Sequence, residues 1–285
     1  MLPKSVTTWL AKHGHGAVVS DHSVSGGCIN DTRVLRTDAG STVFCKHNPA
    51  APAALFAAEA AGLQALAIAG APRVPEVYAV DDHFLLLEYL PPGPRRADYW
   101  ACFGRALAAL HAQGDEHFGF AVDTYCGDTR QPNAACPDGY AFYAQQRFGF
   151  QAQLARTAGL IGAREHQRIE RFAERLSDWV PVQSPALIHG DLWSGNAHTT
   201  SDGAPALIDP AAYYGWPEAE LAMTCLFGGF APDFYAAYEE AAPIAADWRT
   251  RVDLHNVYHL LNHANIFGGA YTGQALAVIQ RYLGE

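Results

Sequence analysis

The stretch L-I-H-G-D-L-W-S-G-N at residues 187–196, followed by L-I-D-P at residues 207–210, decides the fold class of this chain. Asp191 is a carboxylate that can accept a proton from an attacking hydroxyl. Asn196 follows five residues later, and Asp209 comes thirteen residues after that, at the end of an apolar run that predicts a buried strand. Mg²⁺ prefers oxygen ligands. Kinases combine a catalytic-loop Asp with an Asn and a second Asp on the metal ions, at this Asp-to-Asn spacing. The pattern therefore predicts metal-assisted phosphoryl transfer.

Each of these residues also has an ordinary structural explanation, because short motifs often occur by chance. His189 fits a buried core histidine, Asp191 fits a cap in a turn, and Asp209 fits the end of a strand. The ordered set, with its polar residues beside apolar strands, favours phosphoryl transfer over separate coincidences.

Length, composition and charge narrow the classes of protein to which this chain can belong. The chain has 285 residues, of which 49% are apolar, so it can bury a sizeable core in one large domain or two smaller ones. A net charge of -10, without a long Lys or Arg run, argues against nucleic acid or an anionic membrane as the partner. No apolar run is long enough to span a bilayer, and residues 1–16 lack signal-peptide features. The six cysteines form no C-x-x-C pair and fit the reduced thiols of a cytoplasmic protein.

The first 88 residues combine strands with one long helix. Five strands are predicted, at Val18–Val24, Ile29–Thr37, Thr42–Lys46, Val77–Asp81 and Phe84–Leu87. A helix is predicted at Ala53–Ile68, with Pro52 in its first turn. Lys46 ends the third strand, and Glu59 is the only acid of the helix. Kinases hold a strand Lys against the ATP phosphates with a helix Glu, although an isolated Lys and Glu are more commonly solvated surface groups.

Two loops of this half are candidates for nucleotide contacts. The turn at residues 25–28 contains a Gly pair, and such turns can direct backbone N–H groups at phosphate. It does not match G-x-G-x-x-G, and Gly pairs in hairpins usually serve only as turns. At residues 88–93 a strand ends in a Pro/Gly stretch, which marks a domain boundary. Ligand sites often lie at such boundaries, so the backbone there is a candidate for binding adenine.

The rest of the chain is mostly helical. Helices are predicted at residues 97–111, 140–157, 164–180, 218–227, 233–242, 247–267 and 274–283, and an ordered loop at residues 117–128. His255, His259 and His263 recur at four-residue spacing on one helix, which is compatible with zinc binding. No acidic or cysteine pattern supports a metal there, so packing or lining of a substrate pocket is the favoured interpretation.

Motifs along nearly the whole chain resemble the fructosamine kinase (ketosamine kinase) family, a branch of the aminoglycoside-phosphotransferase-like and protein-kinase-like fold. They are S-G-G-C-I-N (25–30), V-F-C-K (43–46), F-G-F with T-Y-C-G and Q-P-N (118–133), H-G-D-L-W-S-G-N (189–196), I-D-P-A-A-Y-Y-G-W-P-E-A-E-L-A (208–222), F-G-G-F (227–230) and L-N-H-A-N-I-F-G (261–268). The resemblance implies an α+β, two-lobed kinase-like fold. Residues 1–88 would form a small ATP-binding lobe with an antiparallel sheet and one main helix. Residues 89–285 would form a larger, mostly helical catalytic and substrate-binding lobe.

The resemblance also implies roles for single residues. Asp191 is implied to be the catalytic base. The other implied contacts are Asn196 and Asp209 for Mg²⁺; Gly26, Gly27, Cys28 and Lys46, with Glu59 holding Lys46, for the ATP phosphates; Glu88, Tyr89 and Leu90 for adenine; and Trp193 and His263 for the sugar substrate. Glu220 matches an acid that braces the catalytic loop, which is a structural role.

The implied activity is ATP- and Mg²⁺-dependent phosphorylation of the third hydroxyl of a ketosamine, a step that leads to deglycation of amines. Two alternatives stay open: a related kinase acting on an aminoglycoside or choline, and a non-catalytic nucleotide-binding or redox-sensing module. One departure concerns residues 134–139, where tryptophans are expected and the chain has A-A-C-P-D-G, so the acceptor preference can differ. Cys28 is a thiol in a phosphate loop and is therefore a candidate redox switch. The protein is expected to be either a monomer or a dimer linked through such a redox-active thiol.

Overall fold

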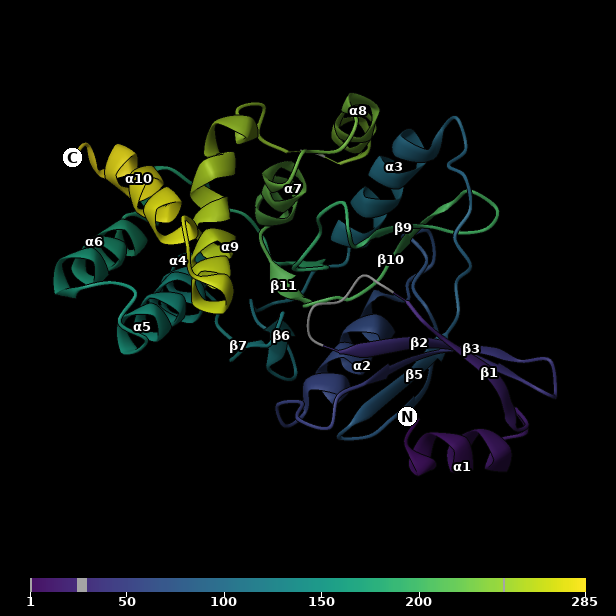
Figure 1. Cartoon of the computed structure of the whole chain (residues 1–285). Coiled ribbons are helices and arrows are strands. Elements are labelled where there is room, and N and C mark those ends of the chain that lie inside the picture. Colours follow the sequence, from purple (N-terminus) through teal and green to yellow (C-terminus); the bar gives the residue numbers. More distant parts are fainter. Residues whose placement is uncertain (1, 25–29, 243) are drawn as a thin grey trace.

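The structure is a computed structural model that describes residues 2–24, 30–242 and 244–285. Figure 1 shows a β-sheet and two helices at the N-terminal end of the molecule, and a larger, mostly helical part that holds the C-terminus. Within residues 2–24, 30–242 and 244–285, no helix is both long and apolar enough to cross a membrane.

The N-terminal part consists of five strands and two helices among the residues that the structure describes. Their bounds are α1 (Lys4–Lys12), β1 (Val18–Ser23), β2 (Asp31–Thr37), β3 (Thr42–His47), α2 (Leu55–Leu66), β4 (Val77–Val80) and β5 (Phe84–Glu88). The strands pair antiparallel in the order β1-β2-β3-β5-β4, so β3 lies in the middle. The predicted antiparallel sheet with one main helix is thus present, and α1 adds a short helix near the N-terminus.

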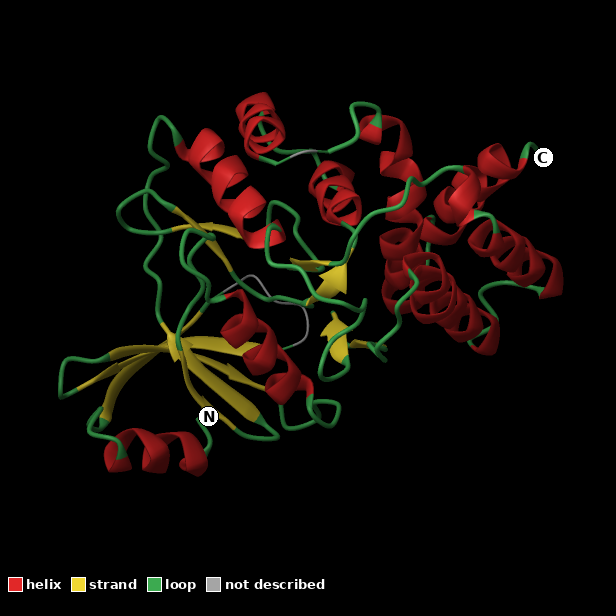
Figure 2. Ribbon diagram, turned by 180° about the vertical axis from the view of Figure 1, so that it is seen from behind, coloured by secondary structure: helices red, strands yellow, loops and turns green. Residues whose placement is uncertain are grey.

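The two helices cover opposite faces of this sheet (Figure 2). Side chains alternate between the faces of a strand. Leu86 of β5 therefore packs with α1, whereas Leu85 and Leu87 pack with α2. The same alternation puts Cys45 of β3 in the α1 cluster and turns its neighbour Lys46 toward the α2 side, where Glu59 lies.

Helix α2 begins later than the sequence predicts. Pro52 lies outside the helix, and Ala54 just before it has a left-handed φ of 64°. A left-handed residue interrupts the helical path, so the predicted start at Ala53 is wrong by two residues. The helix then runs from Leu55 to Leu66 and buries Phe56, among other apolar residues, against the sheet.

The C-terminal part begins with α3 (Tyr99–His111) and is built mainly from helices. The further helical segments are α4 (Gly139–Phe142), η1 (Tyr143–Gly149), α5 (Phe150–Thr157), α6 (Ala163–Glu174), η2 (Leu176–Asp178), α7 (Pro217–Leu226), α8 (Pro232–Ala241), η3 (Trp248–Arg251), α9 (Val252–Phe267) and α10 (Tyr271–Leu283). Helices α3 and α8 pack through Phe103 and Phe234 in one core, while α5, α6, α9 and α10 share a second core. In Figure 1, these two groups lie on either side of α7.

Short strand pairs fix the loops between these helices. They are β6 (Thr124–Cys126) with β7 (Thr129–Gln131), β8 (Ala186–Ile188) with β11 (Tyr213–Gly215), and β9 (Ala197–Thr199) with β10 (Pro205–Leu207). The prediction of a loop throughout residues 117–128 is therefore wrong for β6. The buried strand predicted before Asp209 is present as β10. Three-residue strands without an apolar run, such as β6 and β7, have too little alternation to be found from the sequence alone.

The predicted helix at residues 140–157 is present but changes its winding. Its middle, Tyr143–Gly149, is π-helical. Arg147 in this segment is fully buried, donates to the carbonyl of Pro132 at 2.6 Å and to Oδ1 of Asn133 at 2.7 Å, and lies over the ring of Tyr213. These bonds tie the π-helical segment to the Q-P-N motif.

Candidate active site

A cleft of about 830 Å³ lies between the sheet and the loops of the helical part. Its walls combine residues of the N-terminal strands and α2 with residues that follow β6, β8 and β10. The lining includes Phe44, Lys46, Glu59, Leu87, Glu88, Tyr89, Leu90, Cys126, Asp191, Trp193, Asn196, Asp209, Phe227 and His263. The described residues with a predicted catalytic, nucleotide, metal or sugar role are therefore all on this one surface.

Lys46 is a buried cation between two carboxylates. Its Nζ lies 2.6 Å from Oε1 of Glu59 and 2.6 Å from Oδ1 of Asp209, and its side chain is 5% exposed. Burial by itself lowers the pKa of Lys46, but the two carboxylates outweigh it and hold that pKa above its ordinary value. Burial and the nearby Asp209 raise the pKa of Glu59 despite the ion pair. Lys46 therefore stays protonated and joins the sheet to the loop after β10.

Asp209 has an unusual backbone conformation that aims its carboxylate at this cation. It lies two residues beyond β10 and has a φ of 57°, in the left-handed region. Asp and Asn adopt this region more readily than most residues other than Gly. The side chain remains 44% exposed although Oδ1 contacts Lys46. Asp209 can therefore accept a further cation from the cleft.

Asp191 lies in the loop after β8 and is held by Asn196. Nδ2 of Asn196 donates to the backbone oxygen of Asp191 at 2.8 Å and to Oδ2 of its carboxylate at 3.2 Å. Burial raises the pKa of Asp191 to about 8, with further contributions from the carboxylates of Asp209 and Glu220. A carboxyl group whose pKa is near neutrality is suited to accept a proton during a reaction.

Glu220 supports the loop that carries Asp191. Its carboxylate, buried in α7, accepts the backbone N–H of His189 and, at 3.0 Å, that of Gly190. Nε2 of His189 lies 2.8 Å from the carbonyl oxygen of Ile208, which precedes Asp209. Burial lowers the pKa of His189. The two acidic loops are thus connected through a neutral, fully buried imidazole.

The segment after β5 forms another part of the cleft wall. Glu88 pairs with Arg73, and Nε2 of His198 lies 2.9 Å from the carbonyl oxygen of Leu90. His198 belongs to β9, so this contact joins the end of the sheet to the helical part. Glu88, Tyr89 and Leu90 all line the cleft, as does His198.

Aromatic rings cover the end of the cleft near α9. Trp193, whose exposed fraction is 36%, meets Phe227 edge to face, and Phe227 contacts His263 at 5.1 Å between ring centroids. His263 also contacts the rings of Phe267 and Tyr271. An aromatic surface of this kind can pack against the carbon skeleton of a ligand.

Not all predicted site residues can be placed. Gly26, Gly27 and Cys28 lie outside the described residues. The loop at residues 134–139 is anchored away from the cleft: Cys136 pairs with Phe118 through two backbone hydrogen bonds, and Asp138 caps α4. Within the described part of the chain, the residues that line the cleft include none from 134–139.

The chain matches the family model for fructosamine kinase over residues 1–285. A probable ketoamine kinase of Synechocystis sp. is 41% identical over 266 residues, which cover 92% of this chain and 89% of that protein. This chain belongs to the fructosamine kinase family. The chloroplastic protein-ribulosamine 3-kinase of Oryza sativa subsp. indica is also similar, with 37% identity over 288 residues that cover 98% of this chain and 83% of that protein.

Solved structures confirm the predicted α+β, kinase-like fold. A putative fructosamine-3-kinase of Thermobifida fusca is 33% identical and has a TM-score of 0.89, with 100% of both chains covered. A choline kinase of Streptococcus pneumoniae has a TM-score of 0.64 over 99% of this chain and 98% of that chain, at 14% identity. The second likeness shows a shared fold alone.

In this fructosamine kinase family member, the three histidines of α9 have separate surroundings. His255 lies 3.3 Å from Glu218, and Nδ1 of His263 lies 2.8 Å from the backbone oxygen of His259. His259 instead lies near Asp191 and Cys126. No role was predicted for Cys126, because only the fold brings residues so far apart together; its place in the T-Y-C-G motif was the available signal.

Proposed function

We propose that this chain is a kinase that uses ATP and Mg²⁺ to phosphorylate the third hydroxyl of low-molecular-weight ketosamines, such as fructosyl- or ribulosyl-lysine. The observation that carries the proposal is the placement of Asp191 in one cleft with the Lys46–Asp209 ion pair, in a member of the fructosamine kinase family. The aromatic residues around His263 give this cleft a surface for an organic acceptor.

On this proposal the ATP site lies on the sheet side of the cleft. Lys46 contacts the phosphates and is held by Glu59, while the turn with Gly26, Gly27 and Cys28 supplies backbone N–H groups. The backbone at Glu88, Tyr89 and Leu90 binds adenine, with residues 1–88 as the nucleotide lobe, residues 89–285 as the catalytic lobe, and the connection at about 88–93. Membership of a kinase family and the buried, protonated Lys46 support this assignment.

Asn196 and Asp209 are proposed as the residues that hold Mg²⁺. Their donor set fits this ion, because an amide oxygen and a carboxylate are both hard oxygen ligands, and the Asp209 carboxylate is 44% exposed. When bound, Mg²⁺ would offset negative charge on the transferred phosphoryl group.

Asp191 acts on the acceptor in this mechanism. Its carboxylate accepts the proton of the third hydroxyl as that oxygen attacks the γ-phosphorus. Asn196 and the Glu220-supported backbone fix the position of the carboxylate. Trp193 and His263 hold the sugar. Most of the rate enhancement then comes from positioning and electrostatics, because the protein forms no covalent intermediate.

The phosphorylated product is chemically unstable, and its decomposition makes the reaction a repair step. Loss of a proton from C1 gives the 1,2-enaminol, in which the phosphate on C3 is allylic. The nitrogen lone pair then expels inorganic phosphate to form an imine at C1, and hydrolysis of that imine releases the free amine and a 3-deoxy dicarbonyl sugar. The substrate is an amine adduct, and the net charge of -10 is compatible with a cationic amine rather than an anionic polymer.

An acceptor panel tests the proposal. Initial rates of ADP formation should be highest with fructosyl-lysine or ribulosyl-lysine, and close to background with an aminoglycoside or choline. The same panel with the Trp193→Ala variant should show a raised KM for the ketosamine and an unchanged KM for ATP. Turnover confined to an aminoglycoside or choline would instead assign the chain to that type of small-molecule kinase, and no turnover with any alcohol would favour a non-catalytic module.

A further inference from the structure

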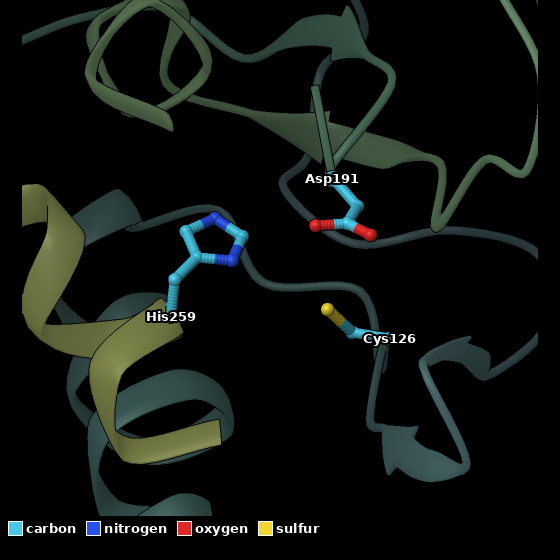
Figure 3. Close-up of side chains that lie close together, drawn as sticks. All are labelled: Cys126, Asp191 and His259. Atoms are coloured by element: carbon cyan, nitrogen blue, oxygen red, sulfur yellow. The ribbon is translucent and has the colours of Figure 1, made fainter. Parts of the chain in front are cut away.

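Three side chains from distant parts of the sequence meet beside the cleft, and two of them, Cys126 and Asp191, line it. Cys126 ends β6, Asp191 follows β8, and His259 lies in the middle of α9. The Sγ atom, a carboxylate oxygen and an imidazole nitrogen of these residues all lie within 4.8 Å of one another. Figure 3 shows that the three side chains face a common space. Thiolate, carboxylate and imidazole are the ligand types that zinc sites use.

His259 supplies a second, independent observation. Its side chain is 5% exposed, and its Nδ1 is buried without a hydrogen-bond partner among the described residues. A buried polar atom that lacks a partner is costly unless something fills its place. In Figure 3 the imidazole turns a ring nitrogen toward Asp191 and Cys126, so the lone pair of a neutral ring is available to a bound ion.

The surroundings also suit a cation. The carboxylates of Asp209 and Glu220 act on Asp191 electrostatically, which adds negative charge around these side chains. Arg147 opposes this charge, but its guanidinium is bonded to Pro132 and Asn133. Cys126 and Asp191 line the cleft, which gives an ion a path from solvent.

We propose that Cys126, Asp191 and His259 form an inhibitory site for Zn²⁺. Tetrahedral zinc places such ligand atoms about 3.4–3.6 Å apart, so side-chain movements of about 1 Å complete the site. Binding forms Zn–S, Zn–O and Zn–N bonds and releases the Cys126 thiol proton to solvent, and water takes the fourth position. The site shares no ligand with the neighbouring Asn196–Asp209 pair proposed for Mg²⁺. Mg²⁺ prefers oxygen ligands, so it is not expected to bind the Cys126 thiolate.

The inhibition, unlike the binding, rests on the proposed function. A carboxylate that ligates Zn²⁺ cannot accept a proton from a hydroxyl, so occupation of the site stops phosphoryl transfer while ATP can still bind. Removal of the ion with a chelator should restore activity.

Metal binding is tested without any assay of activity. Chelator-treated protein is titrated with Co²⁺ as a spectroscopic probe and with Zn²⁺ in competition with a coloured chelator. The expected results are one Zn²⁺ per chain and a thiolate-to-Co²⁺ charge-transfer band. Cys126→Ser should abolish the band, and His259→Gln should weaken Zn²⁺ binding about tenfold or more. Cys102→Ser, which removes a partly exposed thiol on α3, serves as the matched control and should behave as wild type.

The outcomes separate the site from the function. Absence of the band in wild type, or Zn²⁺ affinity that Cys126→Ser and His259→Gln both leave unchanged, would overturn the proposed site. Equal fractional inhibition of wild type and Cys126→Ser by Zn²⁺ would do the same. Stoichiometric binding through Cys126 and His259 without inhibition of ketosamine phosphorylation would support the metal site and overturn the assignment of Asp191 as the base.

Discussion

At the scale of single residues, Asp191 is the position on which the proposed chemistry depends. Replacement by Asn keeps the size of the side chain and removes its ability to accept a proton. We expect Asp191→Asn to lower kcat by about 10²–10⁴-fold, the usual contribution of general-base assistance, with little change in the Kd for ATP. Steady-state kinetics with a ketosamine and a nucleotide-binding titration measure the two effects. Near-normal turnover by this variant would show that another group takes the proton.

Residues separated by short, fixed distances in the chain could be found from the sequence. Asp191, Asn196 and Asp209 follow a kinase spacing, and the structure places all three on one cleft. Lys46 and Glu59 were identified because the strand and helix that carry them were recognisable. Their 2.6 Å contact follows from the side of the sheet that Lys46 faces.

Contacts that depend on tertiary structure alone were not found. No sequence pattern relates Cys126 to His259, and the His repeat on α9, interpreted as packing or pocket lining, does not show which partner each member meets. A repeat of four residues puts side chains on one helix face, but it does not fix what each one meets. The fold gives His255 a carboxylate partner and places His259 beside Cys126 and Asp191.

At the scale of elements, a buried ion pair joins α7, η3 and α9. Nε and Nη2 of Arg251 each donate to Glu218 at 2.8 Å, and Nε2 of His255 lies 3.3 Å from the same carboxylate. Glu218 and Arg251 are 1% and 5% exposed. Removing one partner of such a pair typically costs about 3–5 kcal/mol, because the other charge stays buried.

We therefore expect Glu218→Gln to lower the free energy of unfolding at pH 7 by about 3–5 kcal/mol. Burial alone would raise the pKa of Glu218, but the bonds from Arg251 and His255 lower it below its ordinary value of 4.5. A lowered pKa contributes stability that is complete above that ordinary value and is lost as the pH falls through the folded-state value. The difference between wild type and variant should therefore shrink progressively below pH 4.5.

Urea unfolding of both proteins across this pH range measures the difference. Glu240→Gln, on the exposed surface of α8, is the control and should stay within about 0.5 kcal/mol of wild type. If the difference in unfolding free energy between wild type and Glu218→Gln is the same at every pH, the ion pair does not lower the pKa of Glu218, and the prediction is wrong.

The boundaries and the winding of helices were also predicted less well from the sequence than the presence of the helices. Long helices such as α3 and α9 were recognised by their period, and the start of α2 was misplaced because Ala54 is left-handed. An Ala in that region has no sequence signature, unlike an Asp or Asn. The π-helical turn at 143–149 was also missed, since it depends on the bonds that Arg147 makes to a distant loop.

At the scale of the whole molecule, the sheet and the helical part contribute opposite walls of one cleft. The order of strands and helices predicted a strand-rich N-terminal part and a helical remainder, and the motif resemblance implied the α+β kinase-like fold that the solved structures confirm. The short strand pairs that hold the catalytic loops were only partly predictable: an apolar run marked β10, whereas its partner β9 has three residues and no such run. The position of residues 134–139, outside the cleft wall, supports ketosamine as the acceptor class despite the divergent sequence of this loop.

The most direct test of the central claim is a ³¹P NMR time course of the purified chain with Mg²⁺-ATP and fructosyl-lysine. We predict that a sugar-phosphate resonance appears together with ADP. It should then decay into inorganic phosphate while free lysine accumulates, because 1,2-enolisation makes the phosphate on C3 an allylic leaving group and the resulting imine hydrolyses. A phosphoester that persists, or a spectrum in which ATP is unchanged with ketosamines but consumed with an aminoglycoside or choline, would contradict the proposed function.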